Sequence, residues 1–190
     1  MSLELLGFRL LAPSFGYSLY VFGSLIGLVM IALAFGYWLG GYLGDRGVSL
    51  AGFMKIILTG SVYLFFISLS YQLVLNWLAA FSVVAGALAG SFILFFFPMA
   101  VFASTSPYFT RFLAVNQKQA VGSSSGSVSA WTTVGSLLGT FATAFYLVPE
   151  LGAAFTLYFN TRLSFLIPVI FLSLKKSKTY LFFMLLPLFF

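Results

Sequence analysis

The sequence of 190 residues contains no cysteine and no histidine, and only 6% of its residues are charged. Without cysteine there is no disulfide and no thiolate metal site, and without histidine the commonest general base and metal ligand is missing. A soluble domain carries about a quarter charged residues, so three acidic and nine basic side chains cannot cover a surface in water. We therefore expect neither a cofactor nor a metal site. No signal peptide is evident, because Met1-Ser2-Leu3-Glu4 lacks a basic segment.

What the chain has in abundance is apolar surface. Hydrophobic residues make up 62% of the sequence, and the mean hydropathy is +1.11. The 25 Phe and 10 Tyr suit a surface in contact with lipid. The net charge of +6 is not the signature of a nucleic-acid partner, because an excess of Lys and Arg reports topology in a membrane protein. The composition predicts an all-α integral membrane protein whose main partner is the lipid bilayer.

Five apolar runs are long enough to span a bilayer, which takes about 20 apolar residues. They cover residues 17–43, 51–71, 80–105, 121–148 and 152–174, with a short interfacial piece around Asn76-Trp77 before the third. The apolar pieces at the two ends, 1–11 and 179–190, are too short to span. We read residues 1–190 as one transmembrane domain that forms part of a longer chain. The alternative is that both end pieces are interfacial or re-entrant.

Glycines spaced four residues apart recur along these runs. Because residues four apart share a helix face, such pairs let two helix backbones approach closely. This pattern predicts a tightly packed bundle and no particular chemistry. The pairs are Gly23/Gly27, Gly36/Gly40, Gly40/Gly44, Gly86/Gly90, Gly122/Gly126 and Gly135/Gly139.

Two further features interrupt the apolar runs. Residues 122–136 are rich in small and hydroxylated side chains, which favours helix packing, with the lining of a polar cavity as the alternative. Pro98 and Pro107 bracket residues 99–106. A proline break can shape a binding site or a hinge, but we read Pro107 as the end of a helix.

Arg162 is the one charge that the runs do not place in water. It lies near the middle of 152–174, and an ionisable group at membrane depth is a functional candidate by default. Asn160 is two residues away and faces another direction. The alternative is a displaced helix from which Arg162 extends to the outer interface. Inside the bundle, its partners would be an anionic substrate group or hydroxyls on the preceding run, such as Ser136, Thr140 and Thr143.

The segment Gly40-Gly41-Tyr42-Leu43-Gly44-Asp45-Arg46-Gly47 resembles the cytoplasmic loop motif of the major facilitator superfamily. The resemblance implies a major-facilitator-like half bundle. It also implies that a glycine opens a tight contact, while the acidic and basic residues cap and bridge helix ends. Asp45, Arg46 and Gly47 would take those roles here.

Further segments, taken in order, resemble the membrane domain of fused major-facilitator/spermidine-synthase-like proteins. They are residues 4–16, 18–24 and 36–41, Ser106-Pro107-Tyr108 with Arg111, and residues 135–140 leading to Pro149. Ser14 and Phe22 depart from the family, which usually has Tyr and Trp there. The resemblance implies a cytoplasmic aminopropyltransferase-like domain, for which residues 1–190 contain no nucleotide-binding turn and no acidic pair.

Three functions follow as hypotheses. The first is the membrane module of a spermidine-synthase-like fusion in a prokaryotic plasma membrane. Such a module would anchor a cytoplasmic enzyme domain or move a small solute, and polyamines are the solutes that the resemblance brings in. The second is a half-size transporter that dimerises. The third is a structural subunit of a membrane complex that pairs with another helical subunit.

The charges also predict topology. Basic residues gather after the first, third and fifth runs, at Arg46, Lys55, Arg111, Lys118, Lys175, Lys176 and Lys178, with Asp45 as the one acidic residue. The opposite side receives only Glu4, Arg9 and Glu150. Because basic loops face the cytoplasm, single cysteines at positions 47, 117 and 177 should all be protected from an external thiol reagent. Labelling of any one of them from outside would contradict five crossings.

Overall fold

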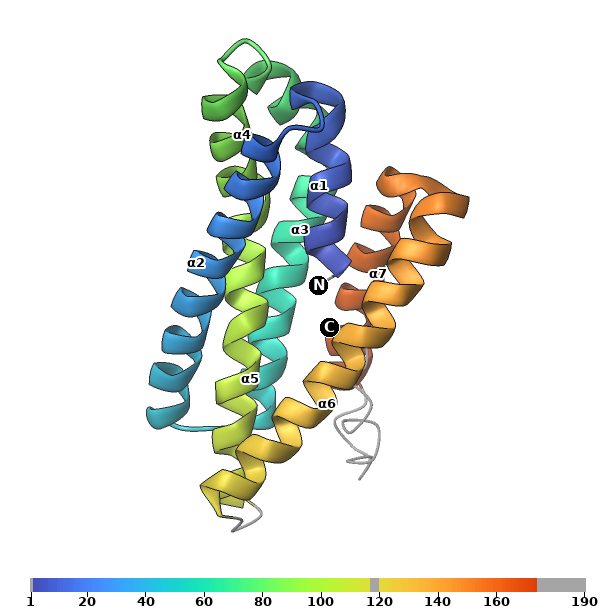
Figure 1. Ribbon diagram of the computed structural model, residues 1–190. Helices are drawn as coiled ribbons and strands as arrows, with labels where there is room; N and C mark the ends of the chain where they lie inside the picture. The colour runs from blue at the N-terminus through green and yellow to red at the C-terminus, as the bar shows by residue number, and fades with distance from the viewer. Residues whose placement is uncertain (1, 117–119, 174–190) are drawn as a thin grey trace.

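The computed structural model describes residues 2–116 and 120–173, and these form an all-α bundle (Figure 1). The residues expected at 117–119 and 174–190, including Lys118, the three lysines at 175–178 and the apolar piece 179–190, lie outside the described residues. The elements are α1 (Ser2–Phe15), α2 (Leu19–Asp45), α3 (Leu50–Leu78), α4 (Val83–Ser91), the π-helical segment η1 (Phe92–Phe96), α5 (Phe97–Asn116), α6 (Val121–Phe141), the π-helical segment η2 (Ala142–Leu151) and α7 (Gly152–Ser173).

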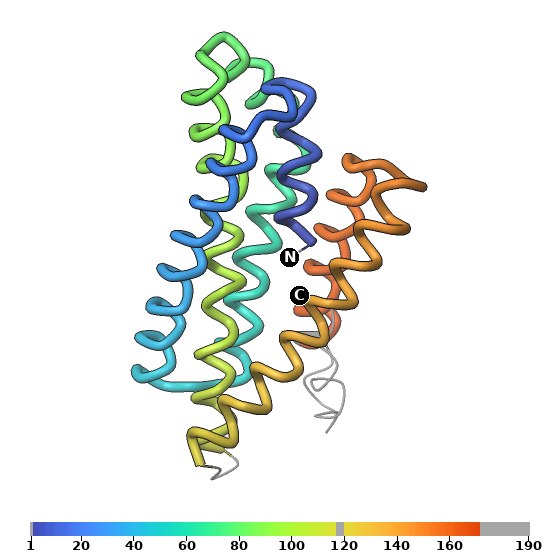
Figure 2. The backbone as a smooth tube through the Cα atoms, in the orientation of Figure 1, coloured from blue at the N-terminus to red at the C-terminus, as the bar shows by residue number. Residues whose placement is uncertain are grey.

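Four helical stretches of the described chain are long and apolar enough to cross a membrane. They are Leu19–Asp45, Leu50–Leu78, Val83–Asn116 and Val121–Phe171. The last stretch contains both the fourth and the fifth predicted run. Gly152, with φ of +80°, reverses the chain there, and the tube in Figure 2 shows α6 and α7 as the two arms of a hairpin. The stretches confirm the all-α prediction and indicate an integral membrane protein.

Two predicted boundaries were wrong. α3 runs on to Leu78, so Asn76-Trp77 belongs to that helix and not to a separate interfacial piece. α5 passes through Pro107 and ends at Asn116. A proline removes only its own backbone donor, and neighbouring helices make such an interruption tolerable inside a packed membrane bundle. Here the Pro107 ring lies against α2, so it is used for packing and does not end the helix.

The closest helix–helix approach joins α2 to α5. The buried residues of α2 form one stripe with spacings of three and four residues: Val21, Leu25, Val29, Ala32, Gly36, Gly40 and Gly44. At its lower end in Figure 1 the stripe is all glycine, and the backbone of α5 lies against it. A Cβ atom on Gly36 would meet the Ala100 carbonyl and lie 2.7 Å from the Ala103 Cβ. One on Gly40 would meet the Ser104 carbonyl and lie 2.7 Å from the Pro107 ring.

Only some of the predicted glycine pairs mediate packing. Gly86 and Gly90 do, because a Cβ on Gly86 would meet the Phe15 ring and one on Gly90 would lie 3.1 Å from Leu11. At five further glycines of these pairs, an added Cβ atom would have no described atom within 4 Å. They are Gly23, Gly27, Gly122, Gly126 and Gly139. The four-residue spacing therefore identifies a smooth helix face but does not reveal which faces are covered.

The apolar core lies where α1, α2, α3 and α5 meet. Phe95, Leu94 and Leu25 are almost fully buried there, together with Leu11 of α1. A second apolar cluster around Met54, Ile57 and Tyr108 joins α3 to the far end of α5. The two clusters hold α2, α3 and α5 as one unit, against which the α6–α7 hairpin and the start of α1 are set.

Gly40→Ala should destabilise the bundle, because the added methyl group overlaps the α5 backbone and cannot be relieved by a side-chain rotation. Overpacking of this kind costs about 1–3 kcal/mol. Gly41→Ala is the matched control, since a Cβ there has nothing within 4 Å and alanine favours a helix. Thermal unfolding in detergent should show a lower midpoint for Gly40→Ala and an unchanged or higher one for Gly41→Ala. Equal midpoints would contradict the close approach.

Candidate functional site

The motif residues at the end of α2 meet the far part of α5. The Asp45 carboxylate forms an ion pair with Arg111, with 3.6 Å between Oδ1 and Nε. Both side chains are largely in solvent, Asp45 at 78% and Arg111 at 48% exposure. Such exposed pairs contribute about 0–1 kcal/mol. The pair shows that the α2–α3 connection and the end of α5 share one end of the bundle.

Arg46 does not bridge two helices. Its guanidinium lies 4.3 Å from the centre of the Tyr42 ring, one turn back on α2, and donates a hydrogen bond to the Tyr42 hydroxyl. Gly47, with φ of +136°, then adopts a backbone conformation that side-chain-bearing residues rarely reach. Among the described residues, the acidic residue of the motif thus contacts a second helix, whereas the basic residue contacts only a tyrosine of α2.

Tyr108 fixes the same connection from α5. Its buried hydroxyl accepts a hydrogen bond from the Ser49 N–H at 3.0 Å and lies 3.2 Å from the Ser49 carbonyl, to which it can donate. Ser49 in turn caps α3 by accepting from the Gly52 N–H at 3.0 Å. Of the residues noted in the sequence, Pro107 and Arg111 contact α2 and Tyr108 contacts the α2–α3 connection, whereas Ser106 lines the cavity described next.

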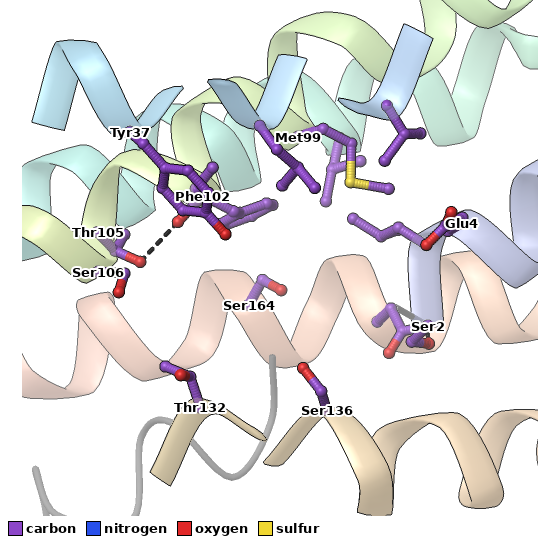
Figure 3. A pocket seen from close by; sticks show the side chains of 16 residues that line it. Ser2, Glu4, Tyr37, Met99, Phe102, Thr105, Ser106, Thr132, Ser136 and Ser164 are labelled. Atoms are coloured by element: carbon purple, nitrogen blue, oxygen red, sulfur yellow. Dashed lines mark hydrogen bonds between the residues drawn. The ribbon is translucent and has the colours of Figure 1, made fainter. Parts of the chain in front are cut away.

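A cavity of about 190 Å³ with a mixed apolar and polar lining lies between α1, α2, α3, α5, α6 and α7 (Figure 3). Hydroxyl and amide side chains line it from five helices, whereas many large apolar side chains are exposed on the outside of the bundle. The polar lining residues are Ser2, Glu4, Tyr37, Thr105, Ser106, Thr132, Ser136, Asn160 and Ser164. The arrangement is suited to holding a small polar molecule within an apolar bundle.

The start of α1 is tied to the α6–α7 hairpin at one side of this cavity. The Asn160 amide donates to Ser2 Oγ at 3.0 Å, and Ser2 Oγ and Thr143 Oγ1 lie 2.7 Å apart in a second hydrogen bond. Thr143 is buried, so this link joins three elements in the interior. Figure 1 marks the N end of the chain at mid-height of the bundle, which places this network far from both ends.

Glu4 brings a carboxyl group into the cavity. It lies in the first turn of α1, is half-buried, and lines the cavity together with Met99 (Figure 3). Within the described residues the carboxyl group has no hydrogen bond and no ion pair. Arg9, on the same helix, is exposed.

The sequence-predicted polar site is only partly assembled. Ser136 and Asn160 line the same cavity, and Thr132 joins them from the hydroxyl-rich segment. Thr140 is half-buried but does not line it, and Arg162 is exposed on α7. Two residues along a helix differ by about 200° in direction, so Asn160 faces inward while Arg162 faces out. Glu4, which is half-buried, also lines the cavity, and the sequence did not predict this. An acidic residue inside the apolar piece 1–11 was the available signal.

Comparison of the chain with known protein families, with curated proteins and with solved structures finds no match. The resemblance to the major facilitator superfamily and to spermidine-synthase-like fusions therefore supports proposals only. What stands is the class that the fold defines, an all-α protein with four long apolar helical stretches and a partly polar cavity among them.

Tyr108→Phe should destabilise the protein more than Asp45→Ala. The first change removes the two hydrogen bonds between the Tyr108 hydroxyl and the Ser49 backbone, each of which contributes about 0.5–1.5 kcal/mol. The second removes an exposed ion pair of about 1 kcal/mol or less. Thermal unfolding in detergent measures both, with insertion into membranes checked for each variant. A larger loss for Asp45→Ala would show that the ion pair, and not the tyrosine hydroxyl, holds this end together.

Proposed function

We propose that this chain is a multi-spanning membrane module that binds a small polar solute in the cavity and moves it across the bilayer. The observation that carries the proposal is a cavity lined by an acid, an amide and several hydroxyls inside a bundle whose exposed large side chains are mostly apolar. Polar and ionisable groups at membrane depth are expensive, and they mark substrate and ion pathways. Sites of this kind lie between helices of a bundle, near the bilayer midplane.

The cavity supports this role more directly than the end contact does. Its walls come from two units, with Tyr37, Thr105 and Ser106 from the packed α2–α5 pair, and Thr132 and Asn160 from the hairpin. Relative movement of two packed units around a fixed site is the way in which many transporters expose a solute to either side. A half-size transporter that dimerises would use this arrangement in each copy.

Anchoring of a cytoplasmic enzyme domain is the second candidate. The observation in its favour is the fixed end formed by Asp45, Arg111 and Tyr108, where basic side chains gather. The positive-inside rule places this end in the cytoplasm, in a prokaryotic plasma membrane if the resemblance is right. A spermidine-synthase-like partner would then dock there, and the same surface would suit a helical partner subunit.

The cavity is tested by single cysteines, which this cysteine-free chain allows without background. Ser136→Cys places a thiol in the cavity, whereas Leu138→Cys places one on the exposed, lipid-facing side of α6, about 200° around the helix. A charged thiol reagent attacks a thiolate, which forms only where water reaches it. In membranes, Ser136→Cys should react about tenfold faster or more.

Equal and slow reaction at both positions would contradict a water-accessible cavity and would leave anchoring as the better account. Reaction at both positions would show that α6 lies outside the lipid. Correct folding of each variant is checked by its elution as a single species and by its thermal midpoint.

A further inference from the structure

We infer that the stretch Val83–Asn116 contains a hinge at residues 91–98, and that the Tyr63 hydroxyl of α3 fixes this hinge and thereby regulates the cavity. The inference rests on the proposed solute-binding function and gives that site a means of regulation. In this stretch η1 joins α4 to α5, and Pro98 is the second residue of α5. Sharp bends in helices occur at prolines and at π turns, and both features are present here.

The carbonyl group of Ile93 has no donor in the π-helical register. A π turn pairs each carbonyl with the N–H five residues further on, which for Ile93 is residue 98. That residue is a proline and has no N–H. The Tyr63 hydroxyl donates a hydrogen bond to this carbonyl at 2.8 Å. Ile93 is 38% exposed on an apolar bundle, and a bilayer offers no water that could replace the tyrosine.

The Tyr63 ring adds a second contact to the same place. Its centre lies 4.6 Å from the centre of the Phe97 ring, which belongs to the first residue of α5. One side chain of α3 therefore contacts both sides of the change from π-helix to α-helix. Only the hydroxyl supplies the hydrogen bond that Pro98 cannot, so the two contributions can be separated by a change from tyrosine to phenylalanine.

Ser91, the last residue of α4, is a buried hydroxyl that lacks a partner. Its Oγ is the one buried side-chain nitrogen or oxygen atom of the described residues that has no hydrogen bond. Serines in helices often donate to a carbonyl three or four residues back, as Ser61 and Ser104 do here. An unpaired buried hydroxyl destabilises the observed arrangement relative to any arrangement in which Ser91 has an acceptor. The hinge region thus has a reason to adopt a second arrangement.

The helices on the two sides of the hinge have different close contacts. The α5 backbone is fixed from Ala100 onwards, because it lies against Gly36 of α2. In α4, the closest contacts of Gly86 are with the Phe15 ring of α1 and the Leu78 carbonyl of α3. A bend at residues 91–98 therefore moves α4 relative to the α2–α5 contact without opening that contact.

The hinge is linked to the cavity through residues that line it. Leu64 follows Tyr63 on α3, Met99 follows Pro98 on α5, and both side chains are part of the lining. Met99 is also buried against the apolar core that surrounds η1. A bend at the hinge changes the direction of Met99, and with it the space between α2, α3 and α5. The hydrogen bond from Tyr63 therefore regulates access to the cavity.

Spin labels on pairs of cysteines measure the bend in the full chain in lipid bilayers. Val84→Cys on α4 with Trp38→Cys on α2 spans the hinge, whereas Trp38→Cys with Val115→Cys on α5 does not and is the control pair. All three positions are exposed. A bend of about 20° moves Val84, which lies about 16 Å along the helix from the hinge, by about 5 Å. Tyr63→Phe should shift or broaden the first distance by up to about 5 Å and leave the second unchanged.

Pro98→Ala distinguishes a hinge from a merely structural role of Tyr63. Alanine restores the N–H at position 98, so the Ile93 carbonyl gains a donor within its own helix. In the Pro98→Ala background, Tyr63→Phe should therefore no longer change the distance. Tyr71→Phe is the matched control on α3, because among the described residues its hydroxyl bonds only to the neighbouring Gln72 side chain. It should leave both distances as they are in wild type.

The reaction rate of Ser136→Cys with a charged thiol reagent connects the hinge to the cavity. Adding Tyr63→Phe should raise this rate by about fivefold, which is the factor that one hydrogen bond contributes to an equilibrium. Pro98→Ala should reverse the increase, and Tyr71→Phe should not produce it. If Tyr63→Phe does not fold, Pro98→Ala alone should still narrow the distribution of the Val84–Trp38 distance, because the helix then has its own donor.

The outcomes separate the hinge from the solute-binding function. A lower thermal midpoint for Tyr63→Phe with unchanged distances would show a structural role only, and the hinge fails. It also fails if Pro98→Ala neither narrows the distribution nor removes the effect of Tyr63→Phe. If the distance shifts while the rate at Ser136→Cys stays the same, the hinge exists but does not regulate the cavity. If Ser136→Cys is unreactive in every variant while the distance shifts, the solute-binding function fails and the hinge stands.

Discussion

The close approach of α2 to α5 is the constraint on which the rest of the structure depends. Gly36 and Gly40 bring the two backbones together, and any side chain there would overlap the Ala100 and Ser104 carbonyls. Because the two helices are held in this way, the side chains next to the α2–α5 contact have fixed directions. Tyr37 follows Gly36, and Thr105 follows Ser104, and both line the cavity. The same two helices thus form the tightest contact of the bundle and one polar wall of its cavity, so the position of that wall follows from the packing.

The polar groups at the end of the α2–α5 contact differ in chemistry from those at mid-height of the bundle because their surroundings differ. Near the α2–α3 connection, Asp45 and Arg111 are exposed, where their attraction is weak, and the buried Tyr108 hydroxyl does more to hold the chain. At mid-height, water is scarce and each polar group needs a partner. Ser2, Thr143 and Asn160 satisfy one another there. Glu4 has no hydrogen bond or ion pair among the described residues, but it is only half-buried, so water can solvate its carboxyl group.

Much of the fold could be predicted from hydropathy, because a long uncharged run has few alternatives to a spanning helix. The glycine spacing in α2 also indicated the face that packs. It could not indicate that Gly122 and Gly126 remain uncovered, because coverage depends on where other helices lie. Likewise, the depth of Arg162 along its helix can be read from sequence, but its direction around the helix axis cannot. That Glu4 lines the cavity could not be predicted for a related reason: a short apolar piece does not show which of its residues face a neighbouring helix.

The polar groups that line the cavity are of two kinds: hydroxyl and amide side chains, and the acidic side chain of Glu4. Hydroxyls such as those of Ser136 and Ser164 both donate and accept hydrogen bonds, so they adapt to a cation, an anion or a neutral molecule. They set the shape and polarity of the space but do not choose the charge of what enters. Among the described lining residues Glu4 alone has a side chain of the acidic or basic types. The place of this lining in the bundle follows from the glycine contact between α2 and α5, because that contact fixes the helices that carry Tyr37 and Thr105.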